Sequence, residues 1–351
     1  MGFIPLNDSY LFSLDGRTDL ADLVLQEANC LLETNTTQLG VLRTQKFSDG
    51  ELCVDFTTSV RGKRVYILSS PNTSDEIMKL NLAIDAAKRG AAREIIPILP
   101  YFPYARQDKK DQSRGPIGAK IMAEMVEQRG ATSVITFDLH ADQIQGFFNI
   151  PITHLEGKNV FDGHIDSIIT PETILCGPDA GSGKRVKRMK DQLQKRYGHN
   201  LNYVMLDKTR KEANVIDEMI IIGDVTGKDV IILDDMVDTA GTLCKAAEVI
   251  MGAGAKSVRA VISHGVLSGP ALERIGNSVL TELIISDSLT KPDPQKVCGK
   301  DFSEEKCHHI INGGNKIKVI SVAKQIGFAM CALNNQYSYE ALKAETTYVI
   351  G

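Results

Sequence analysis

Two adjacent carboxylates end an apolar run in the second half of the chain, and a short stretch of hydroxyl residues and glycine follows them. The run is Val230–Leu233 and the polar stretch is Asp234–Thr242. Adjacent acidic side chains at the end of a buried strand repel one another unless something binds them. The threonines would bring hydroxyl and backbone N–H groups to the N-terminus of a following helix, where a phosphate binds well, and Gly241 would let the ligand approach the backbone. An ordinary helix cap accounts for Thr239 or Asp238 but not for the paired carboxylates.

The paired carboxylates could also accept hydrogen bonds from sugar hydroxyls, so this stretch is a candidate sugar-phosphate site. A second candidate anion site lies in Cys176–Arg185. Gly181 and Gly183 free the backbone there to wrap an anion, and Lys184 adds a positive charge. The segment is not a Walker loop, because the glycine spacing differs and no Ser or Thr follows the lysine.

A strongly charged segment, Pro103–Lys120, contains five basic residues and little apolar material in its first half. We expect a mobile loop that ends at Pro116 and leads into a helix. Lys109, Lys110 and Arg114 could neutralise a polyphosphate. The alternative is a solvated surface turn, which is the more usual origin of a charge run.

Asp138 and His140 follow a predicted strand, so both would lie at its carboxyl end, where open α/β sheets bind their ligands. With Asp142 close by and phosphates expected, this group could hold Mg²⁺, although imidazole is an unusual ligand for that ion. A purely structural histidine is the alternative. A further charged stretch, Asp207–Ala213, indicates no more than a surface charge run when its residues are considered alone.

Composition is that of a globular protein with more than one domain. The 351 residues are 43% hydrophobic and 24% charged, which provides enough apolar material for two cores. A net charge of −4 creates no general field for nucleic acid or an anionic membrane, so phosphate chemistry must rely on local charge. For this reason we do not expect nucleic acid as a partner. We also do not expect a membrane, because no apolar run is long enough to cross a bilayer. The N-terminus has no features of a signal peptide.

The seven cysteines are odd in number, widely spaced and without a Cys-x-x-Cys pair. This usage favours free thiols in a reduced, cytoplasmic compartment. Cys298 and the run Cys307-His308-His309 offer soft metal ligands, but their spacing fits no common zinc pattern. A polar surface insertion is the simpler interpretation.

The elements that must position these residues alternate between strands and helices, which indicates parallel sheets covered by helices. The predicted strands are Arg64–Leu68, Glu94–Leu99, Ser133–Phe137, Asp229–Leu233 and Ser257–Ser263. The predicted helices are Glu76–Arg89, Gly118–Arg129 and Thr242–Met251.

An internal repeat divides the chain in two. Val60–Leu68 matches Val225–Leu233 at an offset of 225 − 60 = 165 residues, and a second match that begins at Gly90 has an offset of 254 − 90 = 164. We therefore predict two similar α/β domains, residues 1–155 and 156–351, with a C-terminal tail able to pack back on the first domain. After its strand the first copy has a loop that contains proline, Ser69–Ile77, whereas the second has acidic and hydroxyl groups with a glycine, so only the second has kept an obvious ligand site.

The segment that ends at Thr242 reads as an apolar run, then Asp-Asp, two residues, Asp-Thr, one residue and Gly-Thr. This pattern resembles the phosphoribosyl diphosphate motif of type I phosphoribosyltransferases and their relatives. The resemblance implies two type I phosphoribosyltransferase-like domains, each a mostly parallel sheet flanked by helices. It also implies a loop for the phosphate and sugar of ribose 5-phosphate. The residues of this loop are Asp234, Asp235, Asp238, Thr239, Ala240, Gly241 and Thr242.

Pro103–Lys120 matches, nearly residue for residue, the catalytic flexible loop of ribose-phosphate pyrophosphokinases, a sequence that ordinary phosphoribosyltransferases lack. The resemblance extends from about residue 7 to about residue 285. It implies transfer of the diphosphoryl group of ATP to the 1-hydroxyl of ribose 5-phosphate, which gives 5-phosphoribosyl 1-diphosphate and AMP. The residues implied to bind ATP are Phe47, Asp49, Glu51, Arg106, Gln107, Asp111 and His140. Those implied to be catalytic are Lys208, Arg210, Arg106, Lys109 and Lys110.

The same resemblance assigns a pyrophosphate loop and a Mg²⁺ cofactor, with His140 and Asp179 as the metal ligands. The loop consists of Asp179, Ala180, Gly181, Ser182, Gly183 and Lys184. It departs slightly from the family pattern, which commonly has Gly-Ala where this chain has Ser-Gly. The resemblance also implies a dimer-based homo-oligomer, of which a hexamer is one form. Extra residues at 291–315 and a divergent tail at 336–351 leave regulation unassigned.

Two other functions stay open. One is a phosphoribosyltransferase that consumes the product, which the loop Arg106–Arg114 and His140 disfavour. The other is a non-catalytic regulatory relative, which is disfavoured because the chain keeps the family's catalytic and metal-binding residues. Formation of AMP from ATP would distinguish the enzyme from both.

Overall fold

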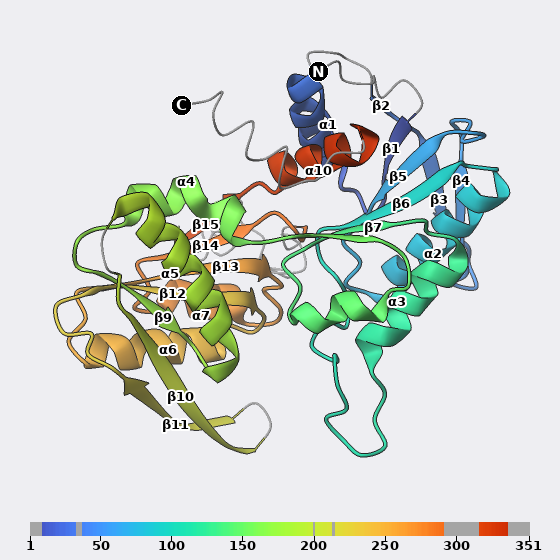
Figure 1. Cartoon of the computed structure of the whole chain (residues 1–351). Helices are drawn as coiled ribbons and strands as arrows, with labels where there is room; N and C mark the ends of the chain where they lie inside the picture. The colour runs from blue at the N-terminus through green and yellow to red at the C-terminus, as the bar shows by residue number, and fades with distance from the viewer. Residues whose placement is uncertain (1–8, 33–36, 199–200, 213–214, 291–315, 336–351) are drawn as a thin grey trace, which may run out of the picture. The chain divides into compact units, whose positions relative to one another are not determined.

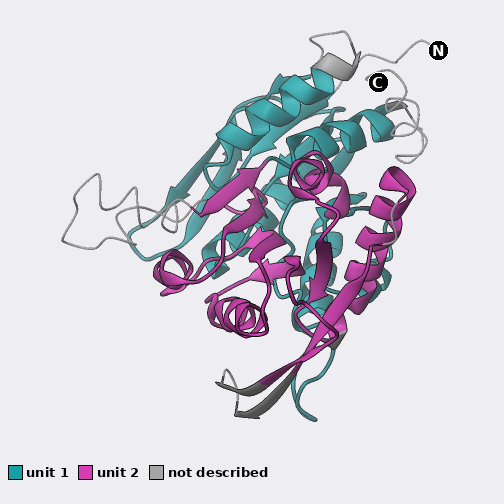
Figure 2. Cartoon of the chain, turned by 90° about the vertical axis from the view of Figure 1, so that its left-hand side faces the viewer, with its two compact units in different colours: residues 1–156, 321–351 teal, residues 157–320 magenta. Residues whose placement is uncertain are grey.

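The computed structural model describes residues 9–32, 37–198, 201–212, 215–290 and 316–335, and the chain divides into two compact units. Unit 1 comprises Met1–Glu156 and Ser321–Gly351, and unit 2 comprises Gly157–Ile320 (Figures 1 and 2). The C-terminal part from Ser321 therefore belongs to the first unit and not to the second. The cysteine and histidine group at 298–309, the insertion at 291–315 and the tail at 336–351 lie outside the described residues.

Unit 1 is built on a six-stranded sheet of order β2-β1-β5-β6-β7-β8, in which every neighbouring pair is parallel. Its strands are β1 (Ser9–Ser13), β2 (Gln38–Leu39), β5 (Arg64–Leu68), β6 (Glu94–Leu99), β7 (Val134–Phe137) and β8 (Ile152–Leu155). A separate antiparallel hairpin is formed by β3 (Leu42–Lys46) and β4 (Leu52–Phe56). Its helices are α1 (Thr18–Leu32), α2 (Ser74–Arg89), α3 (Gly118–Arg129), the short 3-10 helix η1 (Asp142–Phe147) and α10 (Ala323–Asn335).

Helices cover both faces of this sheet (Figure 1). Side chains alternate between the two faces along each strand, so Val65 and Ile67 of β5 point one way and Tyr66 the other. Val65 and Ile67 share a buried core with apolar residues of α2 and α3. Tyr66 points to the opposite face, where α10 packs against α1.

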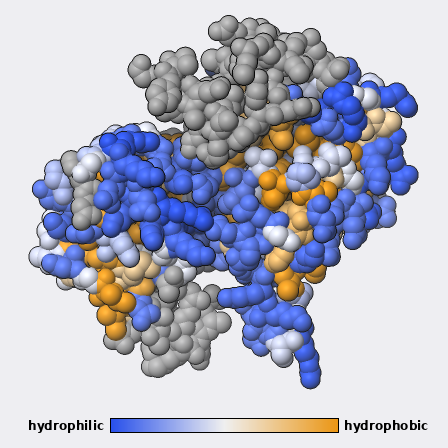
Figure 3. All heavy atoms as spheres, viewed as in Figure 1, coloured by the Kyte–Doolittle hydropathy of each residue, from blue (hydrophilic) through white to orange (hydrophobic). Residues whose placement is uncertain are grey.

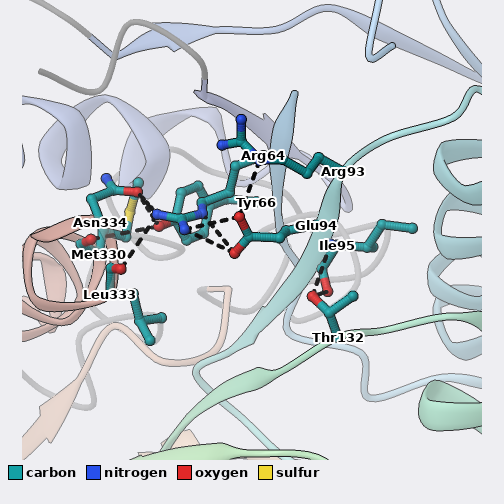
Figure 4. A network of polar contacts seen from close by, with 9 residues as sticks. All are labelled: Arg64, Tyr66, Arg93, Glu94, Ile95, Thr132, Met330, Leu333 and Asn334. Carbon is teal, nitrogen blue, oxygen red and sulfur yellow. Dashed lines mark hydrogen bonds and ion pairs between the residues drawn. The ribbon is translucent and has the colours of Figure 1, made fainter. Parts of the chain in front are cut away.

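A polar network fixes α10 on the sheet (Figure 4). The guanidinium of Arg64 donates two hydrogen bonds of 2.9 Å to the carboxylate of Glu94, and it also donates to the carbonyl of Leu333 and to the side chain of Asn334. The hydroxyl of Tyr66 donates to Asn334 Oδ1 at 3.0 Å. A cation therefore meets the C-terminal end of α10, where the helix dipole favours positive charge.

We predict that Arg64→Met lowers the free energy of unfolding by about 2 kcal/mol, because a half-buried carboxylate and a helix-end carbonyl lose a charged donor. Urea denaturation followed by circular dichroism would measure the change. Arg89→Met is the matched control, since Arg89 pairs with Asp85 on the exposed face of α2 and such pairs contribute little. Equal stability of the two variants would contradict the role given to the network.

Unit 2 is built on a seven-stranded sheet of order β11-β10-β9-β12-β13-β14-β15, in which only the β10–β11 pair is antiparallel. Its strands are β9 (Thr173–Gly177), β10 (Tyr203–Glu212), β11 (Val215–Ile222), β12 (Asp229–Val237), β13 (Ser257–Gly265), β14 (Glu282–Ser286) and β15 (Ile317–Ile320). Its helices are α4 (Lys158–Ile168), the 3-10 turn η2 (Ala180–Ser182), α5 (Gly183–Tyr197), α6 (Gly241–Gly252) and α7 (Ala271–Asn277). The core between this sheet and α6 and α7 is a continuous cluster of buried aliphatic side chains.

The predicted repeat is confirmed by the order of the strands. β1, β5, β6 and β8 of unit 1 correspond to β9, β12, β13 and β15 of unit 2, at offsets of 173 − 9 = 164, 229 − 64 = 165, 257 − 94 = 163 and 317 − 152 = 165. Both units are mostly parallel sheets flanked by helices, as predicted. They differ in where extra residues lie, which is between β6 and α3 in unit 1 and between β14 and β15 in unit 2.

Each half of the chain supplies a helix to the other unit. α4 follows β8 of unit 1 in sequence, yet it packs in unit 2, where Arg196 of α5 forms ion pairs with Asp162 and Asp166. α10 follows β15 of unit 2 and packs against α1 of unit 1. The two helices are themselves related by the repeat, at an offset of 323 − 158 = 165.

Two general features follow from the described residues. Cys53, Cys176, Cys244 and Cys331 are free thiols. None of the helices in the described ranges has the length and apolar character that crossing a membrane requires.

Candidate active site

The two adjacent carboxylates lie near the carboxyl end of β12, beside the start of α6. The prediction that the strand ends at Leu233 was wrong, because β12 continues to Val237. The extension has a physical cause: β13 runs alongside and supplies backbone partners, with Met236 paired to His264 and Val237 to Gly265. We call Asp234–Thr242 the ribose-phosphate loop.

Acidic side chains crowd together at this end of the sheet. Asp235 is only 6% exposed, and its N–H donates to Asp234 Oδ1 at 2.9 Å. Burial is the main cause that raises the pKa of Asp234 well above its ordinary value, and the charges of Asp235 and Asp179 raise that pKa further. Since β9 and β12 are neighbours, Asp179 is brought to the same sheet edge. The arrangement disfavours full ionisation unless a cation or hydroxyl donor binds there.

The start of α6 is open to a ligand. Ala240 caps the helix with φ +59°, and among the described residues no side-chain cap hydrogen bond is made to the first turn. The equivalent helix of unit 1 differs, because Thr73 and Glu76 of α2 form a closed capping box. An ordinary cap by Thr239 or Asp238 is therefore not formed, and the N–H groups at the start of α6 remain available for an anion.

The predicted pyrophosphate loop connects β9 to α5. Ser182 N–H donates to Asp179 Oδ1 at 3.0 Å, and Ser182 Oγ donates to the carbonyl of Asp179 at 2.6 Å, so the serine closes the turn on itself. A side chain at Gly177 would meet the end of the Met205 side chain and Ser182 Oγ at 2.6 Å, so glycine leaves room for both in this turn. Gly181 and Lys184 are exposed, and Ala180 lies in η2. The unusual Ser182 thus has a structural role in this turn.

Lys208 and Arg210 lie on β10, the strand next to β9. β10 pairs with β11 through an irregular register on either side of Arg210. Their side chains lie outside the described residues, so the roles implied for them stay predictions.

In unit 1 the predicted flexible loop connects β6 to α3, and it extends from the unit as a hydrophilic segment (Figures 1 and 3). Lys109, Lys110 and Asp111 are exposed on it. Arg106 and Gln107 line a cavity of about 360 Å³ together with the start of α2. Arg106 and Gln107 are themselves exposed at the border of this cavity, and Lys109, Lys110 and Asp111 also face solvent.

The hairpin residues also face solvent. Phe47 is 45% exposed beyond the end of β3. Glu51 N–H donates to Asp49 Oδ1 at 3.1 Å, and Gly50 has φ +94°. Asp49 and Gly50 thus form a turn, which presents an aromatic ring beside two carboxylates.

His140 follows β7 and is exposed, whereas Asp138 is buried and has φ +42°. Within the described ranges, no three His, Cys, Asp or Glu side chains come close enough to hold a metal ion by themselves. The carboxylate of Asp179 suits a hard cation such as Mg²⁺, which commonly takes its remaining oxygens from substrate phosphates and water, whereas the imidazole of His140 is an unusual ligand for that ion. The residues present therefore fit a Mg²⁺ ion that protein and substrate atoms coordinate together.

Two residues that no motif marked contact the ribose-phosphate loop. Ser268 Oγ donates to the carboxylate of Asp238, and Arg274 Nη1 donates to the carbonyl of Thr239 at 3.0 Å. They follow β13 in sequence, and only the pairing of β13 with β12 brings them to the loop. The turn residues Gly269 and Pro270 were the sole signal in this part of the sequence.

Comparisons with known proteins agree with this geometry. A family model described as the N-terminal domain of ribose phosphate pyrophosphokinase matches residues 9–130, and one described as the phosphoribosyl synthetase-associated domain matches residues 198–339. The ribose-phosphate pyrophosphokinase of Oceanobacillus iheyensis is 40% identical over 334 residues, which cover 95% of this chain and 96% of that protein. The one of Wolinella succinogenes is 47% identical over 246 residues, which cover 70% and 78%.

A solved structure supports the same assignment over both units. The crystal structure of phosphoribosylpyrophosphate synthetase from Mycobacterium smegmatis matches 93% of this chain and 98% of its own, with 31% identity and a TM-score of 0.78. The solved structure and the relative from Oceanobacillus iheyensis thus match 93% and 95% of this chain. The chain belongs to the ribose-phosphate pyrophosphokinase family.

Proposed function

We propose that this protein transfers the diphosphoryl group of ATP to the 1-hydroxyl of ribose 5-phosphate. The observation that carries the proposal is the crowded carboxylate pair beside the uncapped start of α6, in a chain whose relatives along nearly its whole length are named ribose-phosphate pyrophosphokinases. The sugar oxygen forms a bond to the β-phosphorus of ATP, the bond between the β-phosphorus and the oxygen on the α-phosphate breaks, and AMP leaves with that oxygen. The hydroxyl proton goes to solvent.

The ribose-phosphate loop holds the acceptor. The 5-phosphate binds at the open N-terminus of α6, where N–H groups and the helix dipole favour an anion. Asp234 and Asp235 accept hydrogen bonds from the ribose hydroxyls. Burial, and then the charge of Asp235, keep the pKa of Asp234 high without ligand, so the hydroxyl donors of the sugar relieve an unfavourable interaction on binding.

Residues of unit 1 hold the donor. Arg106 and Gln107 bind ATP in the cavity they line, and the aromatic ring of Phe47 stacks on a purine base. The exposed Lys109, Lys110 and Asp111 lie on the long loop between β6 and α3. Closure of this loop over ATP would bring positive charge to the phosphates and exclude water, which limits hydrolysis.

Lys208 and Arg210 stabilise the charge that develops on the diphosphoryl group as it transfers. Phosphoryl transfer makes little demand on a general base, so positioning and charge neutralisation supply most of the rate. Mg²⁺, when bound, neutralises phosphate charge, and we assign Asp179 and His140 as its protein ligands. The loop Asp179–Lys184 holds the diphosphoryl group.

We also infer a dimer-based homo-oligomer and a cytoplasmic location. The exposed hairpin supports the first inference, because Phe47 and its two neighbouring carboxylates face solvent in the single chain and would suit a nucleotide bound mainly by another subunit. The free thiols Cys53, Cys176, Cys244 and Cys331 support the second, since a reducing compartment keeps thiols unpaired.

The proposal is tested by following AMP with a coupled assay on purified protein. AMP should form with ATP, Mg²⁺ and ribose 5-phosphate together, and it should stop when the sugar is omitted or Mg²⁺ is chelated. A protein that binds ribose 5-phosphate but forms no AMP would refute the transfer reaction and leave a non-catalytic regulatory relative. Release of diphosphate from 5-phosphoribosyl 1-diphosphate with a purine base would instead indicate a phosphoribosyltransferase.

The ATP cavity yields a separate prediction. A side chain at Gly118 would meet Gln107 Oε1 at 2.5 Å, and the flexible amide can move aside at little cost. Gly118→Ala should therefore raise the KM for ATP several-fold by displacing Gln107, while the KM for ribose 5-phosphate and the unfolding midpoint stay nearly constant. Gly163→Ala, at a helical position with open space, is the matched control. An unchanged KM for ATP in Gly118→Ala would remove Gln107 from the ATP site.

A further inference from the structure

We propose that Ser268 and Arg274 are positioning residues that orient the ribose-phosphate loop for the 5-phosphate of the acceptor. This inference rests on the proposed function. It concerns the segment Val266–Arg274, which leaves β13, turns through Gly269-Pro270 and enters α7. None of the sequence motifs includes this segment.

The segment engages three consecutive carbonyl groups of the loop. The carbonyl of Val237 accepts from the N–H groups of Val266 and Leu267 at 2.9 and 3.2 Å. The carbonyl of Asp238 accepts from the N–H of Ser268 at 3.1 Å. The third, that of Thr239, accepts from the guanidinium of Arg274 at 3.0 Å.

These bonds determine where the loop's N–H groups point. In a planar trans peptide, the carbonyl of one residue and the N–H of the next point in opposite directions. Holding the carbonyls of Asp238 and Thr239 toward the segment therefore directs the N–H groups of Thr239 and Ala240 away from it. Within the described part of the chain these two N–H groups have no hydrogen-bond acceptor, and they lead directly into the uncapped start of α6. Donors aligned in this way suit an anion.

The backbone at both places is strained. Ala240 and Leu267 have φ of +59° and +51°, in the left-handed region that residues with a β-carbon rarely adopt. A residue in this conformation is unfavourable and persists only where its surroundings hold it. The hydrogen bonds between the loop and the segment provide that restraint, and the bond from Ser268 Oγ to Asp238 adds a side-chain tie.

Arg274 also explains the glycine of the loop. A side chain at Gly241 would approach Arg274 Nη1 at 3.3 Å. Gly241 therefore leaves room for the guanidinium beside the peptide of Thr239. The side chain of Arg274 is exposed, so its replacement should not unfold the protein.

The test compares Arg274→Met, Arg274→Lys and Ser268→Ala, with the affinity for ribose 5-phosphate measured by calorimetry in the absence of ATP. Arg274→Met should weaken binding and raise the KM for the sugar phosphate on the order of tenfold, the usual effect of losing one charged hydrogen bond. The KM for ATP, kcat and the unfolding midpoint should stay nearly constant. Arg274→Lys keeps a charged donor and should recover most of the affinity. Ser268→Ala should weaken binding a few-fold.

Ser257→Ala is the matched control, because Ser257 donates to Asp229 at the other end of the same two strands. It breaks a serine–aspartate bond without touching the loop and should leave the affinity for the sugar phosphate unchanged. Unchanged affinity in Arg274→Met and Ser268→Ala, with normal AMP formation by the unaltered protein, would overturn the positioning role alone. An unaltered protein that neither binds ribose 5-phosphate nor forms AMP would overturn the proposed function and this inference with it.

Discussion

Asp234→Asn is expected to stabilise the ligand-free protein and, in the same variant, to weaken binding of ribose 5-phosphate by about tenfold or more. The carboxylate is driven toward its protonated form by burial and by the charges of Asp235 and Asp179. An amide of nearly the same shape removes that electrostatic cost, and the gain in the free energy of unfolding should be about 1–2 kcal/mol at neutral pH. The amide is a poorer acceptor for sugar hydroxyls, so affinity falls while stability rises.

The pH dependence of the gain identifies its cause. Because the folded-state pKa of Asp234 lies above the ordinary value of 3.8, the folded protein binds the proton more tightly than the unfolded chain does. The contribution of Asp234 to stability is thus fully present below the unfolded pKa and is lost as the pH rises through the raised folded-state pKa. The difference in unfolding midpoint between Asp234→Asn and the unaltered protein should therefore narrow as the pH is lowered toward 4.

The chain provides a control of opposite sign on the same strand. At the start of β12, Asp229 accepts hydrogen bonds from Ser257 and Thr170, and the Ser257 bond is the main cause that lowers the pKa of Asp229. Asp229→Asn should destabilise the protein at neutral pH and leave binding of ribose 5-phosphate unchanged. If Asp234→Asn and Asp229→Asn destabilise the protein alike, other groups of the protein already stabilise the carboxylate of Asp234. The carboxylate pair would then need no ligand to balance its charge.

The two copies of the fold resolve the same crowding differently. At an offset of 165, Ser69 and Ser70 of unit 1 take the places of Asp234 and Asp235. Ser69 donates to Asp15 at 2.6 Å, and the buried guanidinium of Arg17 donates to Ser70 at 3.2 Å. In unit 1 the carboxylate of Asp15 thus has a hydroxyl donor, and the guanidinium of Arg17 is close to it. Unit 2 has two carboxylates, Asp234 and Asp235, where unit 1 has two hydroxyls, so the charge that balances them must come from a bound ligand.

Elements with strong local patterns could be predicted from the sequence with accurate bounds. β5 spans Arg64–Leu68 and α3 spans Gly118–Arg129 as expected, because polar residues bound the apolar run of β5 and Gly130 follows α3. The repeat and the acidic pair were equally visible. The strand ends were not: β12 and β13 continue beyond their apolar runs to Val237 and Gly265, because each provides backbone partners for the other.

Features that depend on which segments meet in space could not be predicted. The apolar side of a helix shows that it packs somewhere, but not that α4 packs in the unit opposite to the sheet it follows. The contacts of Ser268 and Arg274 with the ribose-phosphate loop have the same origin, since a single serine and an exposed arginine carry no pattern. The side chains of Lys208 and Arg210 lie outside the described residues, so for them the resemblance remains the source of the prediction.

Replacing Lys208 with alanine tests most directly the catalytic role that the resemblance implies for this residue. If its ammonium stabilises the diphosphoryl group during transfer, Lys208→Ala should lower kcat about 100-fold to 1,000-fold, as removal of one such donor typically does. The KM for ribose 5-phosphate should change little, because the sugar phosphate is held by the ribose-phosphate loop. Lys211→Ala is the matched control, since Lys211 carries the same charge on the same strand β10 and was interpreted as part of a surface charge run. A loss of kcat in both variants would point to the general positive field of β10. A rise in KM with kcat preserved would instead make Lys208 a binding residue. The reason is that only interactions stronger in the transition state than in the bound substrate accelerate the chemical step.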